Sequence, residues 1–164
     1  LVKRYLDFED KRVIVINQAL GSYVGPAKFW QSDVDSGLGS MTKRRLNHFG
    51  IEMKNAGMVN VTTLDCFARG NQIDHIQFMK IDVEGHELDV LLGGKDMLSQ
   101  GRISCIQFEF GGCNIDTRTY FQDFWYLLGD YTIYRITPLG LRCIKKYREL
   151  DETFVTTNYI AVKK

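Results

Sequence analysis

The apolar positions of the chain fall into short runs separated by turn residues, and their spacing alternates between that of strands and that of helices. Residues 13–16 form a continuous β-branched run, VIVI, which is typical of a strand buried on both faces. The pattern as a whole predicts strands over 13–16, 27–30, 58–64, 77–82, 103–110, 131–136 and 154–162. It predicts helices over 66–69, with Asp65 as N-cap, and over 86–99 and 117–128.

The order of these elements predicts an α/β fold. Strand–helix–strand units favour parallel pairing with right-handed crossovers, so the sheet is expected to be mostly parallel. The last two strands are joined without a helix and are expected to be antiparallel. Residues 31–57 are interpreted as a long loop excursion from a single domain that covers residues 1–164. The strands at 27–30 and 58–64 would flank this loop as a hairpin.

Composition and charge are those of an ordinary globular chain of 164 residues, of which 45% are hydrophobic and 25% charged. Twenty-one Lys and Arg against 20 Asp and Glu leave a net charge of +1, which gives no bulk attraction to nucleic acid or anionic membrane. The four cysteines match no zinc spacing, and reduced thiols are the simpler interpretation. The sequence contains neither a signal peptide nor the run of about 18 apolar residues that a membrane helix needs. We therefore predict a cytoplasmic protein.

Carboxylates and a histidine gather where two predicted strands end. Asp82, Glu84 and His86 follow the strand at 77–82, and Glu109 lies near the end of the next strand. Ligands of open parallel sheets bind beyond the carboxyl ends of the strands, and neighbouring strands lie about 4.8 Å apart. We therefore expect Asp82 and Glu109 to be close enough to share a proton or a ligand.

Structural roles compete with functional ones at these positions. Glu84 and Glu87 open a predicted helix, where the helix dipole stabilises carboxylates by about 0.3–1 kcal/mol. His86, in the first turn of that helix, has a solvated or capping role as its alternative. Glu109 is flanked by residue types that are usually buried, and a carboxylate there needs a partner or a ligand because burying it unpaired is costly. A functional role is therefore favoured for Asp82 and Glu109.

The segment KIDVEGHE at residues 80–87, followed by VLLGG at 90–94, closely resembles the signature of FkbM-type methyltransferases. The segments ALG at 19–21, TLD at 63–65 and IQFEF at 106–110 occur in the order found in that family. The resemblance covers nearly the whole chain. It implies a Rossmann-like class I methyltransferase fold, with a mostly parallel sheet that ends in antiparallel C-terminal strands.

The resemblance further implies an O-methyltransferase that uses S-adenosylmethionine and methylates a hydroxyl of a sugar, glycan or secondary metabolite. Such an enzyme aligns the hydroxyl with the methyl group and removes the hydroxyl proton with a base in hydrogen-bond reach. The candidates for that base are Asp82, Glu84, His86 and Glu109. Family analogy offers an alternative for Asp82, in which it faces the methionine part of the cofactor, and it places Gln18 and Ala19 at the adenine pocket. No metal ligands are expected.

The chain departs from the family pattern at its N-terminus. Family members begin with a strand that carries a Gly-rich cofactor loop and a second strand that ends in an acid, whereas only twelve residues precede Val13 here. We therefore expect a C-terminal fragment of a longer enzyme, with the N-terminal strands missing. The loss of the central strand would cost a stability of the order of a whole domain's, about 5–15 kcal/mol. Tight calorimetric binding of S-adenosylmethionine to the 164 residues would contradict this expectation.

Three other functions compete with methyl transfer to a hydroxyl. Asp82 and Glu84 form a D-x-D variant, the metal motif of nucleotide-sugar glycosyltransferases, although so short a motif is common by chance. Manganese-dependent binding of a nucleoside diphosphate would favour that reading. A non-catalytic scaffold could use the aromatic segment 120–126 as a contact surface, although core packing is an equally simple role for it. Nucleic-acid methylation is disfavoured by the charge balance and by the lack of a basic stripe.

Overall fold

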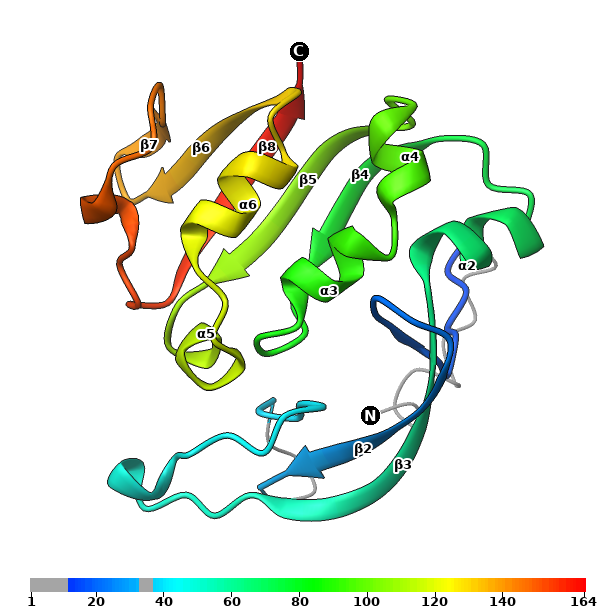
Figure 1. The fold of residues 1–164 in the computed structure, drawn as a ribbon, viewed down its shortest axis with the longest axis vertical. Helices are drawn as coiled ribbons and strands as arrows, with labels where there is room; N and C mark the ends of the chain where they lie inside the picture. Colours follow the sequence, from blue (N-terminus) through cyan, green and yellow to red (C-terminus); the bar gives the residue numbers. More distant parts are fainter. Residues whose placement is uncertain (1–11, 33–36) are drawn as a thin grey trace.

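The computed structural model describes residues 12–32 and 37–164, which form two mixed β-sheets with helices between and beside them (Figure 1). The small sheet has the strand order β1-β3-β2, and the large sheet has the order β4-β5-β8-β6-β7. The strands are β1 Ala19–Leu20, β2 Gly25–Gln31, β3 Lys54–Thr62, β4 Ile76–Ile81, β5 Ile103–Phe110, β6 Tyr131–Thr137, β7 Gly140–Cys143 and β8 Thr157–Lys163. The helices are η1 Asn47–Phe49, α2 Leu64–Gly70, α3 Glu87–Leu92, α4 Lys95–Ser99, α5 Gly112–Thr117, α6 Phe121–Leu127 and η2 Glu149–Asp151.

The predicted hairpin around the loop excursion is confirmed. Strands β2 and β3 pair antiparallel, with Lys28 opposite Met58, and β1 joins β3 in parallel register. Part of the chain between them is loop, but β3 already begins at Lys54, so the excursion ends earlier than residue 57. The predicted single domain over residues 1–164 stays a prediction, because residues 1–11 and 33–36 lie outside the described part.

The prediction of a mostly parallel sheet is wrong for the described residues. Strands β4 and β5 are parallel neighbours as expected, with Ile81 opposite Phe108, and β6 and β8 are antiparallel as expected. However, β5 and β8 are antiparallel too, and the unpredicted strand β7 adds a further antiparallel pair with β6. Strands β6 and β7 are joined by a tight turn and pair antiparallel, and β8 then inserts between β5 and β6, antiparallel to both.

The large sheet buries one face under helices. Figure 1 shows α3, α4 and α6 on the same face of this sheet. Aromatic rings fill the space between: the ring centroid of Phe108 lies 4.7 Å from that of Phe124 and 5.6 Å from that of Tyr159. Phe121 and Phe124 are fully buried, whereas Tyr126 is 73% exposed. In the aromatic segment, Phe121 and Phe124 thus belong to the core, whereas Tyr126 and Tyr120, which is 51% exposed, lie at the surface.

The predicted helix over 86–99 is interrupted at two glycines. Helix α3 ends at Leu92 and α4 begins at Lys95, with Gly93 and Gly94 between them. The carbonyl oxygen of Gly93 accepts a hydrogen bond from the backbone N–H of Asp65 (2.9 Å), at the start of α2. This contact with a segment distant in sequence is invisible to the leucine periodicity, which runs through the break.

The predicted helix over 117–128 is also divided. Its first residue belongs to the end of helix α5, and the rest corresponds to helix α6. Helix α5 ends at Thr117, and Arg118 takes a left-handed conformation (φ 56°) before α6 begins at Phe121. The buried Asn114 side chain accepts a hydrogen bond from the backbone N–H of Gly111 (2.8 Å), which explains why a helix begins five residues before the predicted position.

Asp65 does not cap its own helix as predicted. Thr63 is the N-cap of α2, with its hydroxyl accepting from the backbone N–H of Cys66 (3.1 Å). The carboxylate of Asp65 instead accepts from the backbone N–H groups of Asp96 (3.0 Å) and Met97 (3.1 Å). It therefore caps α4, whose own N-cap, Gly94, has no side chain.

The predicted buried strand over 13–16 is wrong. These residues are outside any regular element, and Ile14 is 80% exposed. A β-branched run becomes a strand only where neighbouring strands bond its N–H and C=O groups, and no strand of the described chain pairs with it. The short strand β1 begins three residues later, at Ala19. At the other end, β8 begins at Thr157 instead of the predicted residue 154.

Candidate active site

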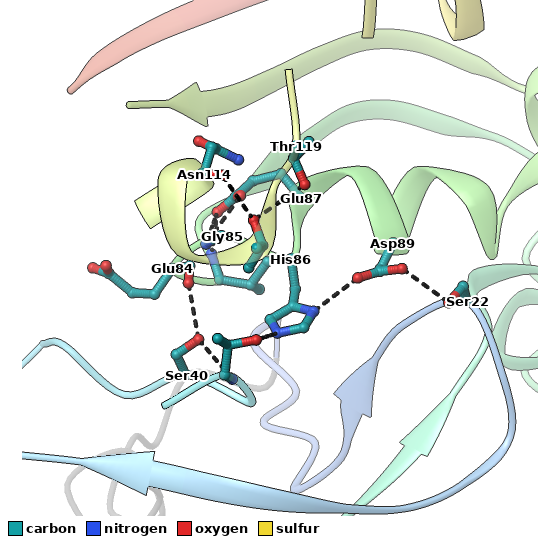
Figure 2. Close-up of polar contacts among 12 residues, drawn as sticks. Ser22, Ser40, Glu84, Gly85, His86, Glu87, Asp89, Asn114 and Thr119 are labelled. Carbon is teal, nitrogen blue, oxygen red and sulfur yellow. Dashed lines mark hydrogen bonds and ion pairs between the residues drawn. The ribbon is translucent and has the colours of Figure 1, made fainter. Parts of the chain in front are cut away.

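The turn after β4 carries most of the predicted site residues, and buried Glu87 holds it together. Glu87 is 0% exposed, and its carboxylate accepts hydrogen bonds from the backbone N–H groups of Val83 (3.1 Å) and Gly85 (3.1 and 3.2 Å), as Figure 2 shows for Gly85. Burial raises the pKa of this carboxyl, while the N–H donors and the neighbouring His86 act in the opposite direction. Glu87 is thus a structural residue of the turn.

The backbone of this turn lies close to helix α5. Glu84 (φ 53°) and Gly85 (φ 104°) both take positive φ, a region in which a non-glycine residue is uncommon. A β-carbon on Gly85 would lie 3.0 Å from the carbonyl oxygen of Cys113 and from the methyl group of Thr117. The turn therefore packs directly against α5, and this fixes where Glu84 and His86 project.

His86 is held between two side chains. Its Nδ1 lies 2.8 Å from Oδ2 of Asp89, and its Nε2 lies 2.9 Å from the hydroxyl oxygen of Thr42. The hydroxyl of Ser22 donates to the other carboxylate oxygen of Asp89 (3.0 Å), so the chain Ser22–Asp89–His86 is continuous (Figure 2). The His86 side chain is only 16% exposed. His86 is thus half-buried and bonded instead of solvated, and although it occupies the N-cap position of α3, its side chain makes no capping hydrogen bond.

The hydrogen bonds decide which nitrogen of His86 carries the proton. The hydrogen bond to His86 holds the pKa of Asp89 below its usual range, and the hydroxyl of Ser22 adds to this effect. An ionised carboxylate only accepts hydrogen bonds, so Nδ1 of His86 donates to it. In the neutral ring, Nε2 is then the acceptor and faces the hydroxyl of Thr42. A lone pair aimed at a hydroxyl is the arrangement of a general base.

All three residues predicted to bind the cofactor line one cavity. Gln18, Ala19 and Asp82 meet around a space of about 520 Å³, together with Phe29 and Met41. The carboxylate of Asp82 is half-exposed and pairs with Nζ of Lys80 at 2.5 Å. Apolar walls with a few polar groups at one end are typical of small-molecule sites.

His86 lines a second, adjoining cavity. This space of about 370 Å³ is bordered by Ser22, His86 and Asp89, and by Tyr23 and Met41 among others. Met41 borders both cavities, so the space beside Asp82 and the space beside His86 are neighbours. The two spaces are of a size to hold two small molecules, or two parts of one, next to each other.

Glu84 points away from both cavities and is paired. Its carboxylate forms an ion pair with Arg44, and its backbone oxygen accepts from the hydroxyl of Ser40 (2.9 Å). Burial raises the pKa of Glu84, and the guanidinium of Arg44 opposes this rise. The nitrogen Nε of Arg44 is buried and, within the described chain, has no hydrogen-bond partner.

Glu109 lies near three other carboxyl groups. Its pKa is raised to about 7, first by burial and then by the charges of Asp82, Glu84 and Glu87, against the opposing charge of Arg44. Asp82 is therefore near enough to act on Glu109 electrostatically, as expected from the strand register. In the described residues, however, no hydrogen bond joins the two, and Asp82 bonds Lys80 instead.

Glu84, Glu109 and Cys113 bring three potential metal-ligand atoms within 4.8 Å of one another, although no metal ligands were expected from the sequence. Burial raises the pKa of the Cys113 thiol to about 12, with the nearby carboxylates adding to the shift, so the free thiol is protonated at neutral pH. A metal here would have to displace the guanidinium of Arg44 from Glu84. Asp82 does not join this group, so the described geometry offers no support for a D-x-D metal site.

The family model for the methyltransferase FkbM domain matches residues 3–133. This is most of the chain, and it contains every residue of the site just described. The chain belongs to the FkbM methyltransferase family. It is therefore a methyltransferase domain, and its family typically uses S-adenosylmethionine and requires a methyl acceptor. Neither a curated protein nor a solved structure matches the chain closely enough to add to this assignment.

Membership of the FkbM family implies a Rossmann-like methyltransferase fold, as expected from the signature at residues 80–87. The described part of the chain shows two mixed sheets. Family membership also makes methyl transfer a better account of Asp82 and Glu84 than glycosyl transfer. Among the described residues, no helix is both long and apolar enough to cross a membrane.

Sequence reasoning missed several residues that shape this FkbM site. Asp89 lies three residues after His86, the spacing at which helical side chains meet, so a signal for this pair was present. Ser22, Thr42 and Arg44 come from turns and from the loop before β3. No periodicity places such residues, because loop geometry depends on contacts made by the folded chain.

Proposed function

We propose that this domain is an S-adenosylmethionine-dependent O-methyltransferase whose acceptor is a hydroxyl of a sugar, glycan or secondary metabolite. The single observation that carries the proposal is the environment of His86, whose Nε2 lies 2.9 Å from a hydroxyl oxygen and whose Nδ1 lies 2.8 Å from the carboxylate of Asp89. This arrangement suits removal of a proton from a hydroxyl oxygen. The match to the FkbM domain supports methyl transfer as the reaction.

The cavity around Asp82 fits the proposed cofactor. Its walls are largely apolar, with Ala19 and Phe29 suited to an adenine ring, and the amide of Gln18 offers a hydrogen-bonding group beside them. The carboxylate of Asp82 can accept hydrogen bonds from the amino group of the methionine part. S-adenosylmethionine, when bound, supplies an electrophilic methyl group. Gln18, Ala19 and Asp82 are the residues proposed to hold it.

The acceptor is proposed to enter the adjoining cavity beside His86. The hydroxyl oxygen of Thr42 lies 2.9 Å from Nε2 of His86, so an acceptor hydroxyl reaches this nitrogen when the Thr42 side chain turns aside. An acceptor hydroxyl that takes this position would donate its proton to Nε2 and present its oxygen toward the cavity across Met41. Asp89 keeps the ring in the required tautomer and stabilises the imidazolium that forms, as the aspartate of a serine hydrolase triad does.

Glu109 is the rival base. A carboxyl group with a pKa of about 7 also exchanges protons readily at neutral pH. However, Glu109 is absent from the residues that line the two cavities, and its neighbours are other carboxyl groups. Asp82 is assigned to the cofactor, and Glu84 is occupied by Arg44. We therefore assign the base to His86.

The test combines cofactor binding with methyl transfer to a panel of hydroxylated acceptors, using S-adenosylmethionine with a labelled methyl group. His86→Gln is expected to lower kcat about 10²–10⁴-fold, as for loss of a general base, and to leave the dissociation constant of the cofactor unchanged. Asp82→Asn is expected to weaken cofactor binding about tenfold or more.

Two matched controls are available. His75→Gln removes an exposed histidine that also bonds one hydroxyl, that of Ser104. Asp130→Asn removes the carboxylate of another Lys–Asp pair, with Lys163. Loss of transfer in Glu109→Gln but not in His86→Gln would contradict the assignment of the base. No cofactor binding by the unaltered chain at millimolar concentration, or equal binding by Asp82→Asn and Asp130→Asn, would contradict the proposed cofactor site.

A further inference from the structure

Two arginines stand directly opposite each other at the edge of the large sheet. In the register of the antiparallel strands β6 and β7, Arg135 pairs with Arg142. Opposite residues of an antiparallel pair point to the same face, with their β-carbons about 4.5–5.5 Å apart, and like charges in that position destabilise the sheet. A negative charge beside the pair would offset this repulsion.

The described protein does not supply that charge as an ion pair. Neither Arg135 nor Arg142 forms a salt bridge with any described residue, whereas nearby Arg148 pairs with Asp151 at 3.2 Å. Arg135 is nevertheless held in place, because its Nη2 donates to the hydroxyl oxygen of Thr157 (3.1 Å). That hydroxyl in turn donates to the carbonyl oxygen of Val155 (2.9 Å). One guanidinium is thus preorganised beside a partly free second one.

Both guanidinium groups line a cleft of about 560 Å³. Its other polar lining residues are neutral, among them Thr156, Thr157 and Asn158, and none of its lining residues is acidic. Arg142 also borders a smaller cleft of about 270 Å³ with Lys145 and two further cationic residues, where Asp151 is the one acid. The volume of the larger cleft is that of a small-molecule site, and its charged groups are the two guanidinium groups, which only donate hydrogen bonds.

We propose that this cleft binds a tetrahedral oxyanion, a phosphate or sulfate group, carried by a small molecule. Guanidinium groups match such anions because their parallel N–H donors form bidentate, charge-assisted hydrogen bonds. Among the neutral side chains that line the cleft, Thr157 lies on the same face as the two arginines, with its hydroxyl bonded to Arg135. The bound anion would also remove the repulsion between Arg135 and Arg142. The proposal stands apart from the methyl-transfer site and does not depend on it.

Calorimetric or NMR titration of the full chain tests the proposal, with inorganic phosphate, sulfate and acetate as probes. Arg142 is exposed, so Arg142→Gln is expected to fold normally. It should weaken phosphate binding about tenfold or more, as should Arg135→Gln. Arg69→Gln, which removes an equal charge from an exposed position of α2, should bind phosphate as the unaltered chain does. Equal binding by Arg142→Gln and Arg69→Gln, or tighter binding of acetate than of phosphate and sulfate, would overturn the proposal; the ratio of phosphate to sulfate affinity identifies the preferred anion.

Thermal unfolding gives a second readout that does not depend on detecting weak binding. Without phosphate, Arg142→Gln should melt at the same or a higher temperature than the unaltered chain, because it relieves a like-charge contact. With phosphate, the melting temperature of the unaltered chain and of Arg69→Gln should rise, while that of Arg142→Gln should not. A lower melting temperature of Arg142→Gln without phosphate, or an equal rise in all three proteins, would contradict the proposed site.

Discussion

The pKa of Glu109 reflects both its burial and the other carboxyl groups of the candidate site. Its pKa is raised to about 7 because it is half-buried and because three other carboxyl groups face it. In the unfolded chain the same group titrates near 4.5. Between these two values the folded protein therefore binds a proton that the unfolded chain has released.

This difference predicts the direction of a pH dependence. Because the folded state binds more protons between about pH 4.5 and 7, the free energy of unfolding falls as the pH rises through that window. Glu109→Gln should remove a slope worth about 1–2 kcal/mol, after allowance for solvent screening of a half-exposed group. Urea unfolding at several pH values measures it. Glu52→Gln, at an exposed position, serves as the control, and an unchanged slope in Glu109→Gln would refute the assignment.

At the scale of elements, the short helix α4 depends on a residue outside it. Its N-cap is Gly94, and the carboxylate of Asp65 accepts from two of its first backbone N–H groups. A helix of five residues is too short to be stable alone. The carboxylate of Asp65 therefore stabilises the first turn of α4 by bonding N–H groups that have no partner within the helix.

Removing the carboxylate of Asp65 should destabilise the protein as much as removing an N-cap side chain that belongs to the helix itself. Asp65→Ala is expected to lower the free energy of unfolding by about 0.5–2 kcal/mol, and Asp65→Asn should restore most of it because the amide oxygen still accepts. Chemical denaturation compares these variants with Asp74→Ala, which changes a fully exposed aspartate. If Asp65→Ala and Asp74→Ala have equal stability, the carboxylate of Asp65 is not a cap.

The elements also show which parts of the structure the sequence could predict. Alternating or uniformly apolar runs with strands beside them, such as 27–30 and 103–110, formed where expected. The run at 13–16 has the strongest strand composition of all, yet it is not a strand, because pairing partners decide and composition does not. The helix over 86–99 was broken by contacts of Gly93 with residues far away in sequence.

The candidate site also has a part that the sequence could predict and a part that it could not. The segment 80–87 was found from its position at the end of a strand, and it does carry Asp82, Glu84 and His86. The partners that give these residues their chemistry, Thr42 for His86 and Arg44 for Glu84, come from an irregular loop. Local patterns could predict which residue types gather at the sheet edge, but not which of them would be paired.

At the scale of the whole molecule, Gly93 is the point where the small sheet meets the helices of the large one. A β-carbon at this position would lie 2.0 Å from the carbonyl oxygen of Gly21, just after β1, and 3.3 Å from Cα of Thr63, just before α2. Both obstacles are backbone atoms, which cannot turn aside as a side chain can. The next residue after Gly21 is Ser22, which donates to Asp89 in the candidate site. The same contact therefore sets both the docking of the small sheet and the hydrogen-bond chain to His86.

Gly93→Ala should separate these parts without altering any polar group. Its φ of −73° suits alanine, so any loss comes from crowding, for which about 1–3 kcal/mol or more is expected in urea unfolding. Gly70→Ala is the matched control: it changes the last residue of α2, where an added β-carbon meets nothing within 4 Å, and should be neutral or slightly stabilising. Since Ser22 would shift with Gly21, Gly93→Ala should also raise the pKa of Asp89 toward its usual range, measured by NMR titration of its carboxyl carbon. Equal stability of the two variants would show that the small sheet does not rest on this contact.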